Sequence, residues 1–176
     1  MNTKKLILYV AAVLLAGSWS VNADSGKAPS EWKLIWADEF DKDGKPDPAK
    51  WKPENTGFLR NKEEQWYTDS QENAFVKDGF LHLVARKADL PNPWYKPGSA
   101  NWKLNRERIG ITSAGLITSG LFAFQYGRVE MRARMPKGKG VWPAFWMIGT
   151  DKRKGGWPAI GEVDIFEYMG REPGKS

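Results

Sequence analysis

Hydrophobic and polar residues alternate along much of the chain, and glycine and proline separate the alternating segments. This period-two pattern predicts β-strands, whereas no convincing amphipathic helix follows the amino end. In residues 75–86 (FVKDGFLHLVAR), two apolar runs flank Asp78-Gly79, which predicts a hairpin. Residues 121–126 (LFAFQY) and 128–135 (RVEMRARM) predict two further strands. We therefore predict an all-β fold, an antiparallel two-sheet sandwich.

The amino end has the three parts of a secretory signal peptide. Lys4 and Lys5 are basic, residues 6–17 (LILYVAAVLLAG) are apolar and uncharged, and Val21 and Ala23 suit a cleavage site. The alternative is a membrane anchor, but a run of about a dozen residues is too short to cross a bilayer. We predict a signal peptide over residues 1–23, cleavage after Ala23, and a secreted or periplasmic protein whose mature chain has no membrane span.

Composition narrows the possible chemistry. The 176 residues suffice for one domain, and 41% of them are hydrophobic, which allows a sizeable core. The absence of cysteine excludes disulfides and thiol catalysis, and a single histidine, His82, excludes two-histidine metal motifs. The formal net charge is +6, but the basic clusters lie beside glycines in predicted turns, so we expect no nucleic-acid partner. Ten tryptophans indicate either a thick aromatic core or a groove for flat ligands.

Residues 141–148 (VWPAFWMI) are the first candidate for a binding surface. On a strand, Trp142, Ala144 and Trp146 share one face, so two indoles flank a small side chain. Sugar rings stack on such an aromatic platform. The alternative is a core strand that is buried on both faces. Pro143 slightly favours the groove, because proline weakens a central strand.

Residues 161–167 (GEVDIFE) are the second and more informative candidate. Glu162 and Asp164 are two residues apart and share a strand face, while Val163 and Ile165 point to the core. Regular alternation would place Glu167 with the two apolar residues. An unpaired carboxylate buried there would cost several kcal/mol, so regular alternation is disfavoured.

A β-bulge at Ile165-Phe166 resolves the conflict by returning Glu167 to the face of Glu162 and Asp164. The two glutamate Cα atoms would then be ~13 Å apart. If the side chains lean together, their carboxyl groups approach ~5 Å, near the separation in retaining glycosidases. The alternatives are a solvent-exposed acidic face and a calcium site, although one strand face offers few converging oxygens.

With the rest of the chain, this segment resembles glycoside hydrolase family 16 in its laminarinase-like, endo-β-1,3-glucanase form. GEVDIFE resembles the family signature E-x-D-x-x-E in its bulged form. The resemblance covers residues 32–170, and Gly115 stands where the family usually has arginine. The other similar segments are WADEF (36–40), KW (50–51), NKEEQWYT (61–68), TSAGL (112–116), YGRVE (126–130), GVWPAFWMIG (140–149) and GWP (156–158).

The resemblance implies a concanavalin-like β-jelly-roll with a sugar-binding cleft on its concave face. It implies that Glu162 is the nucleophile, Glu167 the acid/base, and Asp164 a residue that orients Glu162. It also implies five substrate-binding residues: Trp142 and Trp146 around the scissile bond, Asn61 and Arg86 on the glycone side, and Trp157 along the cleft.

The implied substrate is laminarin or another β-1,3-glucan, with mixed β-1,3/1,4-glucan as a further possibility. Two alternatives stay open: a related galactanase acting on agar, porphyran or carrageenan, and a non-catalytic β-glucan-binding protein, which would be expected to lack the glutamates. We expect a monomer with no required cofactor and no metal at the site, and a structural calcium ion stays open.

The end of the chain also generates an expectation. Only the segment YMGREPGKS follows Glu167, and its pattern is typical of a strand end that runs into a turn. We therefore expect residues 24–176 to hold the N-terminal and catalytic-strand part of a family 16 domain. The jelly-roll would be incomplete at its C-terminus, and this fragment alone would be inactive.

Overall fold

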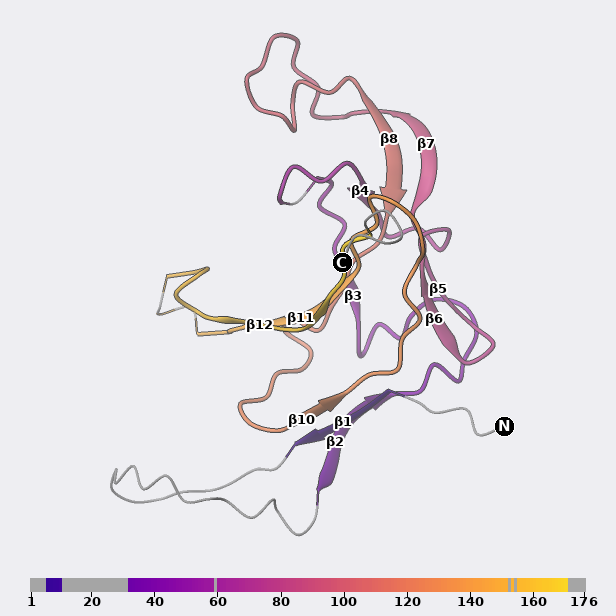
Figure 1. Ribbon diagram of the computed structural model, residues 1–176, viewed down its shortest axis with the longest axis vertical. Coiled ribbons are helices and arrows are strands. Elements are labelled where there is room, and N and C mark those ends of the chain that lie inside the picture. The colour runs from indigo at the N-terminus through magenta and orange to yellow at the C-terminus, as the bar shows by residue number, and fades with distance from the viewer. Residues whose placement is uncertain (1–5, 11–31, 59, 152, 154, 171–176) are drawn as a thin grey trace. The chain divides into compact units, whose positions relative to one another are not determined.

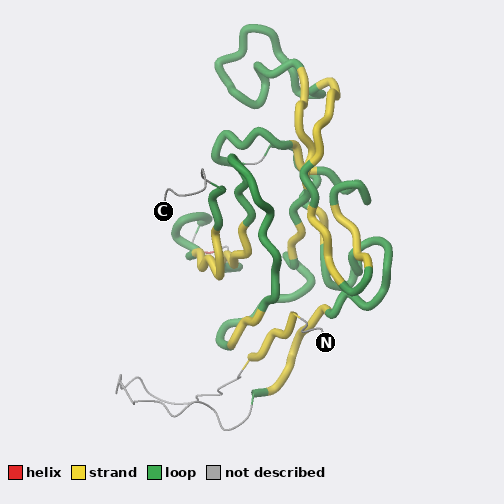
Figure 2. The backbone as a smooth tube through the Cα atoms, turned by 45° about the vertical axis from the view of Figure 1, so that its right-hand side comes forward, coloured by secondary structure: helices red, strands yellow, loops and turns green. Residues whose placement is uncertain are grey.

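The computed structural model describes residues 6–10, 32–58, 60–151, 153 and 155–170, and the elements β1 to β12 are all strands (Figure 1). The predicted all-β class is therefore confirmed, and Figure 2 shows strands joined by loops. No helix within these ranges is long and apolar enough to cross a membrane. The chain divides into two compact units, Met1–Glu130 and Met131–Ser176, which are described separately below.

In the first unit, β1 (Leu6–Val10) pairs antiparallel with both β2 (Lys33–Asp38) and β10 (Arg128–Glu130). Residues 6–10 belong to the predicted signal peptide. The rest of that segment, with its cleavage site, lies outside the described residues, so the signal peptide stays a prediction.

Three further sheets complete the first unit. β7 (Arg86–Pro91) pairs antiparallel with β8 (Arg108–Ser113), and β4 (Trp66–Tyr67) pairs parallel with β8. β3 (Lys52–Pro53) pairs with β9 (Leu116–Ile117). The second unit holds one ladder, β11 (Ala144–Ile148) with β12 (Glu162–Glu167).

The remaining sheet of the first unit is the predicted hairpin, which is confirmed. β5 (Ala74–Lys77) pairs antiparallel with β6 (Phe80–Leu83), and Asp78 and Gly79 form the two-residue connection. Both residues have positive φ, 52° and 77°, as a type I′ turn requires. His82 stacks on Phe75 with ring centroids 4.7 Å apart, so it is a packing residue of the hairpin.

The two strands predicted for residues 121–126 and 128–135 are largely wrong. The first segment is a turn and loop, and only Arg128–Glu130 of the second is a strand. Phe122 stacks on Trp36 and Phe124, with centroids 5.7 and 6.0 Å away, while Tyr126 is 65% exposed. Alternation predicts which side chains would share a face, but a strand also needs a hydrogen-bonded neighbour along its length.

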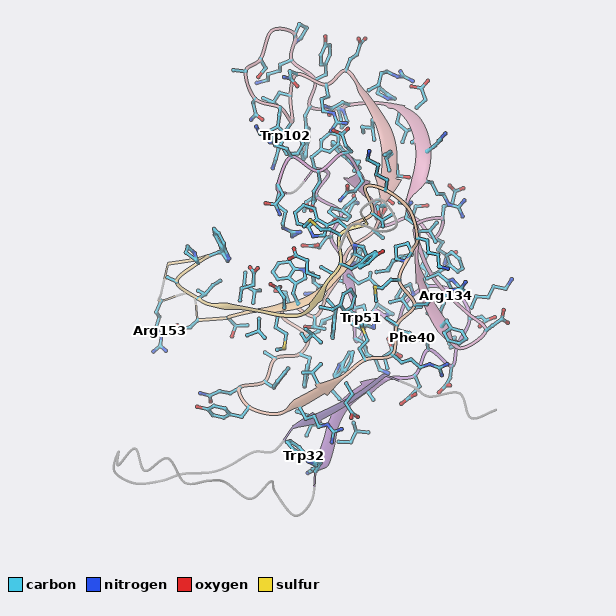
Figure 3. The ribbon with its side chains drawn as sticks, viewed as in Figure 1. Trp32, Phe40, Trp51, Trp102, Arg134 and Arg153 are labelled. Atoms are coloured by element: carbon cyan, nitrogen blue, oxygen red, sulfur yellow. The ribbon has the colours of Figure 1, made fainter. Side chains whose placement is uncertain are left out.

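An aromatic core joins two loops of the first unit. Phe58 is completely buried, and its ring meets Trp66 at 4.9 Å and Trp102 at 5.6 Å. Trp94 lies 4.7 Å from Trp66, and Figure 3 labels Trp102 at this site. Gly57 allows this packing, because a Cβ atom there would lie 2.7 Å from Trp94 and 2.8 Å from Trp66.

The WADEF and KW segments meet at a buried carboxylate. Asp38 is 6% exposed and accepts hydrogen bonds from the Trp51 indole at 2.7 Å, the Lys50 ammonium at 3.3 Å and the Phe40 amide at 3.2 Å. The Trp51 ring, labelled in Figure 3, also packs edge-on against Trp36 at 5.3 Å. Because a buried carboxylate is costly without such partners, this cluster fixes β2 against the segment that follows it.

The loop that carries Asn61 has a tight backbone and an ion pair at its base. Asn61 and Lys62 both adopt left-handed φ angles, 55° and 54°. Arg60 donates to the Glu54 carboxylate at 3.0 Å. Because non-glycine residues rarely adopt this conformation, the surrounding contacts must hold the loop in place.

The same loop holds a partly buried acid. Burial raises the pKa of Glu63 above its ordinary value of 4.5; the charge of Arg60 opposes this shift, and the charge of Glu54 adds to it. Burial also raises the pKa of Tyr67, whose hydroxyl accepts a hydrogen bond from Gln65 at 3.1 Å. The protonated form of Glu63 is thus favoured by folding.

Replacing Asp38 by alanine should lower the free energy of unfolding of the full-length protein by roughly 2–3 kcal/mol, because the Trp51 indole and Lys50 lose a charged acceptor. Urea denaturation measures the change. Asp69→Ala, at an exposed aspartate of the same unit, is the control and should change stability by less than about 0.5 kcal/mol. Equal losses in the two variants would contradict a structural role for Asp38.

Glu63→Gln should change how stability depends on pH. Because the folded-state pKa of Glu63 lies above its ordinary value of 4.5, the native state binds the proton more tightly than the unfolded chain. The stability that this proton contributes is complete below that value and is lost as pH rises through the raised pKa. Thermal melts between about pH 4 and about pH 7 should therefore show a smaller decline for Glu63→Gln than for the wild type. Glu72→Gln, at an exposed glutamate, should decline as the wild type does, and parallel curves for all three proteins would refute the assignment.

Candidate active site

The candidate site is built on the antiparallel ladder between β11 and β12. Ile148 pairs with Glu162, Trp146 with Asp164, and Ala144 with Glu167. The register shifts once, between Phe145 and Trp146, which leaves Ile165 as the extra residue of β12. The β-bulge predicted from the spacing of the acids is therefore present where the sequence requires it.

The register places the three carboxylates on one face. Ala144, Trp146 and Ile148 alternate along β11, so their side chains point the same way, and residues paired across a ladder share that direction. Glu162, Asp164 and Glu167 follow their partners. Their Cα positions span four steps of β11, ~13 Å between the outer two. All three residues are exposed, so they present a row of carboxylates to solvent.

The indole of Trp142 contacts the last of these carboxylates. Its Nε1–H donates to Glu167 Oε1 at 2.8 Å. The pairing continues past the regular ladder to make this possible, since the amides of Tyr168 and Gly170 donate to the carbonyls of Pro143 at 3.0 Å and Val141 at 2.7 Å. Trp142 is 44% exposed, so one surface of its ring stays open beside Glu167.

The opposite face of the ladder is apolar. Phe145 and Phe166 are paired, with ring centroids 6.4 Å apart, and Met147 pairs with Val163. The expectation that Val163 and Ile165 lie in a core is wrong for the described structure, because they are 57% and 36% exposed. The register directs Val163 away from the carboxylates, and the described residues of this unit form a ladder of two strands.

Trp146 and Trp157 occupy different positions in the second unit. Trp146 lies within β11 and is half-buried. The register pairs it with Asp164, so it lies beside the middle of the three carboxylates. Trp157 is 67% exposed and lies in the connection from β11 to β12. The amides of Ile160 and Gly161 close this connection onto the carbonyls of Gly156 and Pro158 at 3.1 and 3.0 Å. Trp157 is thus outside the ladder face.

The two remaining predicted residues, Asn61 and Arg86, belong to the first unit and lie on different elements of it. Asn61 is exposed in the loop before β4. Arg86 begins β7 and is exposed, and its Nε–H donates to the Glu72 carbonyl at 2.7 Å. The structure therefore gives Arg86 a defined role in tying β7 to the turn that precedes the hairpin.

Gly115 leaves room for a neighbouring acid. It stands where the resemblance predicts arginine, and a Cβ atom there would lie 2.5 Å from Glu54 Oε2. The Glu54 amide donates to the Gly115 carbonyl at 2.9 Å, while its carboxylate pairs with Arg60. Arg60, which precedes Asn61 in the same loop, therefore pairs with the Glu54 carboxylate in place of an arginine at position 115.

Sequence reasoning missed the side chains that support the Asn61 loop. Glu63, Gln65 and Tyr67 alternate along the chain, and the side chains of Glu63 and Gln65 both hydrogen-bond to Tyr67. Arg60 pairs with Glu54, and the charges of both act on Glu63. The available signal is the spacing of Glu63, Gln65 and Tyr67 within NKEEQWYT, which directs the three side chains to the same side of an extended chain. Among the residues that the structure describes, no cluster of three or more His, Asp or Glu side chains could hold a metal ion.

Chemically, the ladder face combines carboxylate acceptors with the partly exposed ring of Trp142. Two carboxylates separated by a third can act on opposite sides of one bond, and the Trp142 N–H fixes one oxygen of Glu167. This arrangement suits acid/base and nucleophilic work on a sugar ring.

Comparison with known proteins agrees with this geometry. The sequence model of Glycosyl hydrolases family 16 matches residues 61–176. The chain is 38% identical to a beta-glucanase of Rhodothermus marinus, over 98% of this chain and 57% of that protein.

Solved structures agree as well. The laminarinase catalytic domain of Thermotoga maritima is 39% identical, with a TM-score of 0.66, over 81% of this chain and 53% of that one. A structure from work on endo-acting O-glycanases, which human gut microbiota express to initiate mucin breakdown, is also 39% identical, with a TM-score of 0.73 over 82% and 51%. The chain thus spans little more than half the length of these relatives.

These matches confirm the jelly-roll fold that the resemblance implied, here with short sheets. The family model covers most of the chain and includes β11, β12 and the three carboxylates. The chain belongs to glycosyl hydrolases family 16.

Proposed function

We propose that the full-length protein is a secreted endo-glycosidase that hydrolyses β-1,3-glucans, including mixed β-1,3/1,4-glucans, with retention of anomeric configuration. The observation that carries this proposal is the bulged β11–β12 ladder, which aligns Glu162, Asp164 and Glu167 on one face. Similarity to the Rhodothermus beta-glucanase and the Thermotoga laminarinase supports the choice of substrate. The basic, apolar and small residues of the amino end support secretion.

In the first step, a carboxylate oxygen of Glu162 attacks the anomeric carbon and the glycosidic C–O bond breaks. Glu167 delivers its proton to the departing oxygen, so the leaving sugar departs as a neutral alcohol. In the second step, Glu167 takes a proton from water, the water oxygen attacks the same carbon, and Glu162 is released. Two inversions at one carbon give net retention.

Asp164 and Trp142 position the two glutamates in this scheme. Asp164 lies between them on the strand face and orients Glu162. The Trp142 N–H occupies Oε1 of Glu167, so Oε2 is the oxygen that carries the transferable proton. Trp142 and Trp146 provide ring faces for the sugars on either side of the scissile bond, and Trp157 extends that lining. Asn61 and Arg86 bind sugar hydroxyls on the glycone side.

A second candidate is cleavage within galactose-containing or mucin-type glycans. It is favoured by one observation, the TM-score of 0.73 to the structure from the O-glycanase work. The same carboxylates would carry out the reaction, and the difference would lie in which sugars the loops accept. An activity panel that contains both substrate classes separates the two candidates.

The function is tested by release of reducing ends from laminarin, mixed-linkage glucan, agarose, carrageenan and mucin O-glycans. We expect the wild type to act on laminarin. Glu162→Gln should keep about a thousandth of that rate or less, because removing one member of a catalytic unit typically costs at least that much. Glu107→Gln, at an exposed glutamate on a loop, should keep the wild-type rate. Proton NMR of the first product should show the β-anomer. An α-anomer, or a tenth of the rate remaining in Glu162→Gln, would refute the roles.

Trp142 variants separate the hydrogen bond from the ring face. Trp142→Phe keeps an aromatic surface but removes the N–H that fixes Glu167, so kcat on laminarin should fall about tenfold, equivalent to about 1.4 kcal/mol, with little change in KM. Trp142→Ala also removes the stacking surface and should raise KM. Steady-state kinetics distinguish the two effects. If Trp142→Phe has the wild-type kcat, the hydrogen bond to Glu167 does not contribute to catalysis.

A further inference from the structure

The connection between β7 and β8, residues 92–107, is the least expected feature of the first unit. Figure 1 shows it extending past the ends of both strands. It exceeds the length of about 12–15 residues above which a loop is usually functional or disordered. None of the predicted site residues lies in this loop, and its internal contacts decide between these two possibilities.

A buried asparagine organises the loop. Asn92 is 5% exposed, and its side-chain amide donates to the carbonyls of Lys103 at 2.9 Å and Arg106 at 2.7 Å. Its Oδ1 accepts from the Trp94 amide at 2.9 Å. Backbone hydrogen bonds also join the two sides of the loop, for example from Asn92 N to Glu107 O at 2.9 Å. This network gives the segment a defined shape.

The loop presents aromatic side chains on a rigid base. Trp94 packs against Trp66, which in turn packs against the fully buried Phe58. Trp94 and its neighbour Tyr95 nevertheless each keep 38% of their surface exposed. Aromatic rings held by packing from behind and open in front lose little conformational entropy when a ligand stacks on them.

The same loop is tied to the one that carries Asn61. Arg106 donates to the carbonyls of Glu63 and Glu64, both at 3.4 Å, pairs with the Glu64 carboxylate, and lies 4.7 Å from the Phe58 ring. Asn61 and Trp94 therefore belong to two loops that share one aromatic and ionic core.

The loop combines exposed aromatic rings with several charged residues. Arg106 is paired with Glu64, and Arg108 with Asp89 at 2.6 Å. These two guanidinium groups are therefore paired, whereas Lys96 is exposed next to Tyr95 and Lys103 lies 5.8 Å from the Trp102 ring. Because the loop keeps these lysines, it is the exposed aromatic rings, and not an absence of charge, that indicate the ligand. Neutral sugar rings, which stack on aromatic faces, match this chemistry.

We propose that Trp94 and Tyr95 form an accessory binding surface for neutral sugar residues of the substrate polysaccharide, beyond the sugar that Asn61 contacts. The inference rests on the proposed function, in that the ligand is the glycan that the enzyme cleaves. The surface binds chains long enough to reach it, so it sets the preference for chain length and leaves the chemical step unchanged.

The test is a chain-length series of β-1,3-gluco-oligosaccharides, from three to about eight sugars, with the full-length protein. Tyr95→Ala and Trp94→Ala should each raise KM for the longest oligosaccharides and for laminarin by roughly five- to a hundredfold, the scale of one lost stacking contact. The kinetics on the trisaccharide and kcat on every substrate should be unchanged. Tyr126→Ala, at a 65% exposed tyrosine elsewhere in the unit, is the matched control. It should leave KM and kcat unchanged on every substrate.

Tyr95→Ala separates loss of the binding surface from misfolding. Trp94 packs against Trp66 in the aromatic core, whereas Tyr95 is in none of the ring pairs of the described residues, so its removal should leave that core intact. The same loss on short and long substrates in Tyr95→Ala, or no loss on either, would overturn the inference. A larger loss on carrageenan than on neutral glucan would overturn the assignment of a neutral ligand.

Failure of the proposed function would look different. If the wild type cleaves no β-glucan, calorimetry with long gluco-oligosaccharides still measures binding. Affinity that falls at least fivefold in Tyr95→Ala would then support the surface without the activity. Binding that is absent, or equal in wild type and variant, would refute the surface as well.

Discussion

The candidate site depends on one geometric constraint, the two-residue period of a β-strand. Side chains at odd spacing fall on opposite faces, and Glu162 and Glu167 are at odd spacing. The single unmatched residue, Ile165, removes the conflict without interrupting the ladder on either side. The carboxylate face, the contact between Trp142 and Glu167 and the apolar opposite face all follow from that irregularity. Three like charges side by side do not stabilise a strand, so the arrangement is better explained by chemistry than by stability.

The first unit shows a different balance, in which buried polar groups hold irregular backbone. Asp38 binds three donors, and Asn92 organises a long loop through its side-chain amide. Phe58 and the tryptophans around it then join two loops that have little regular structure of their own. Specific hydrogen bonds and aromatic packing here take the place of long sheets, which explains the many tryptophans better than a thick conventional core does.

Local features were predictable from the sequence, whereas features that depend on distant neighbours were not. The Asp78-Gly79 turn and the bulge beside Ile165 follow from residue type and spacing within a few positions. The strand predicted at residues 121–126 failed because alternation carries no information about pairing, and Phe122 packs on Trp36 instead. The bond from Trp142 to Glu167 joins residues of two different segments, and the raised pKa of Glu63 arises from burial, so neither could be predicted from a local pattern.

The bulge has a consequence for how this strand tolerates changes in length. Ile165 has no partner on β11, and the residues on either side of it keep theirs. A deletion of one residue at this point would restore plain alternation, with Glu162, Asp164 and the second glutamate still on one face and still four steps of β11 apart. An insertion between Glu162 and Asp164 would instead turn one carboxylate to the apolar side. Evolution can therefore shorten this strand at a single position without rebuilding the site, and natural sequences of two lengths can carry the same three acids in the same geometry.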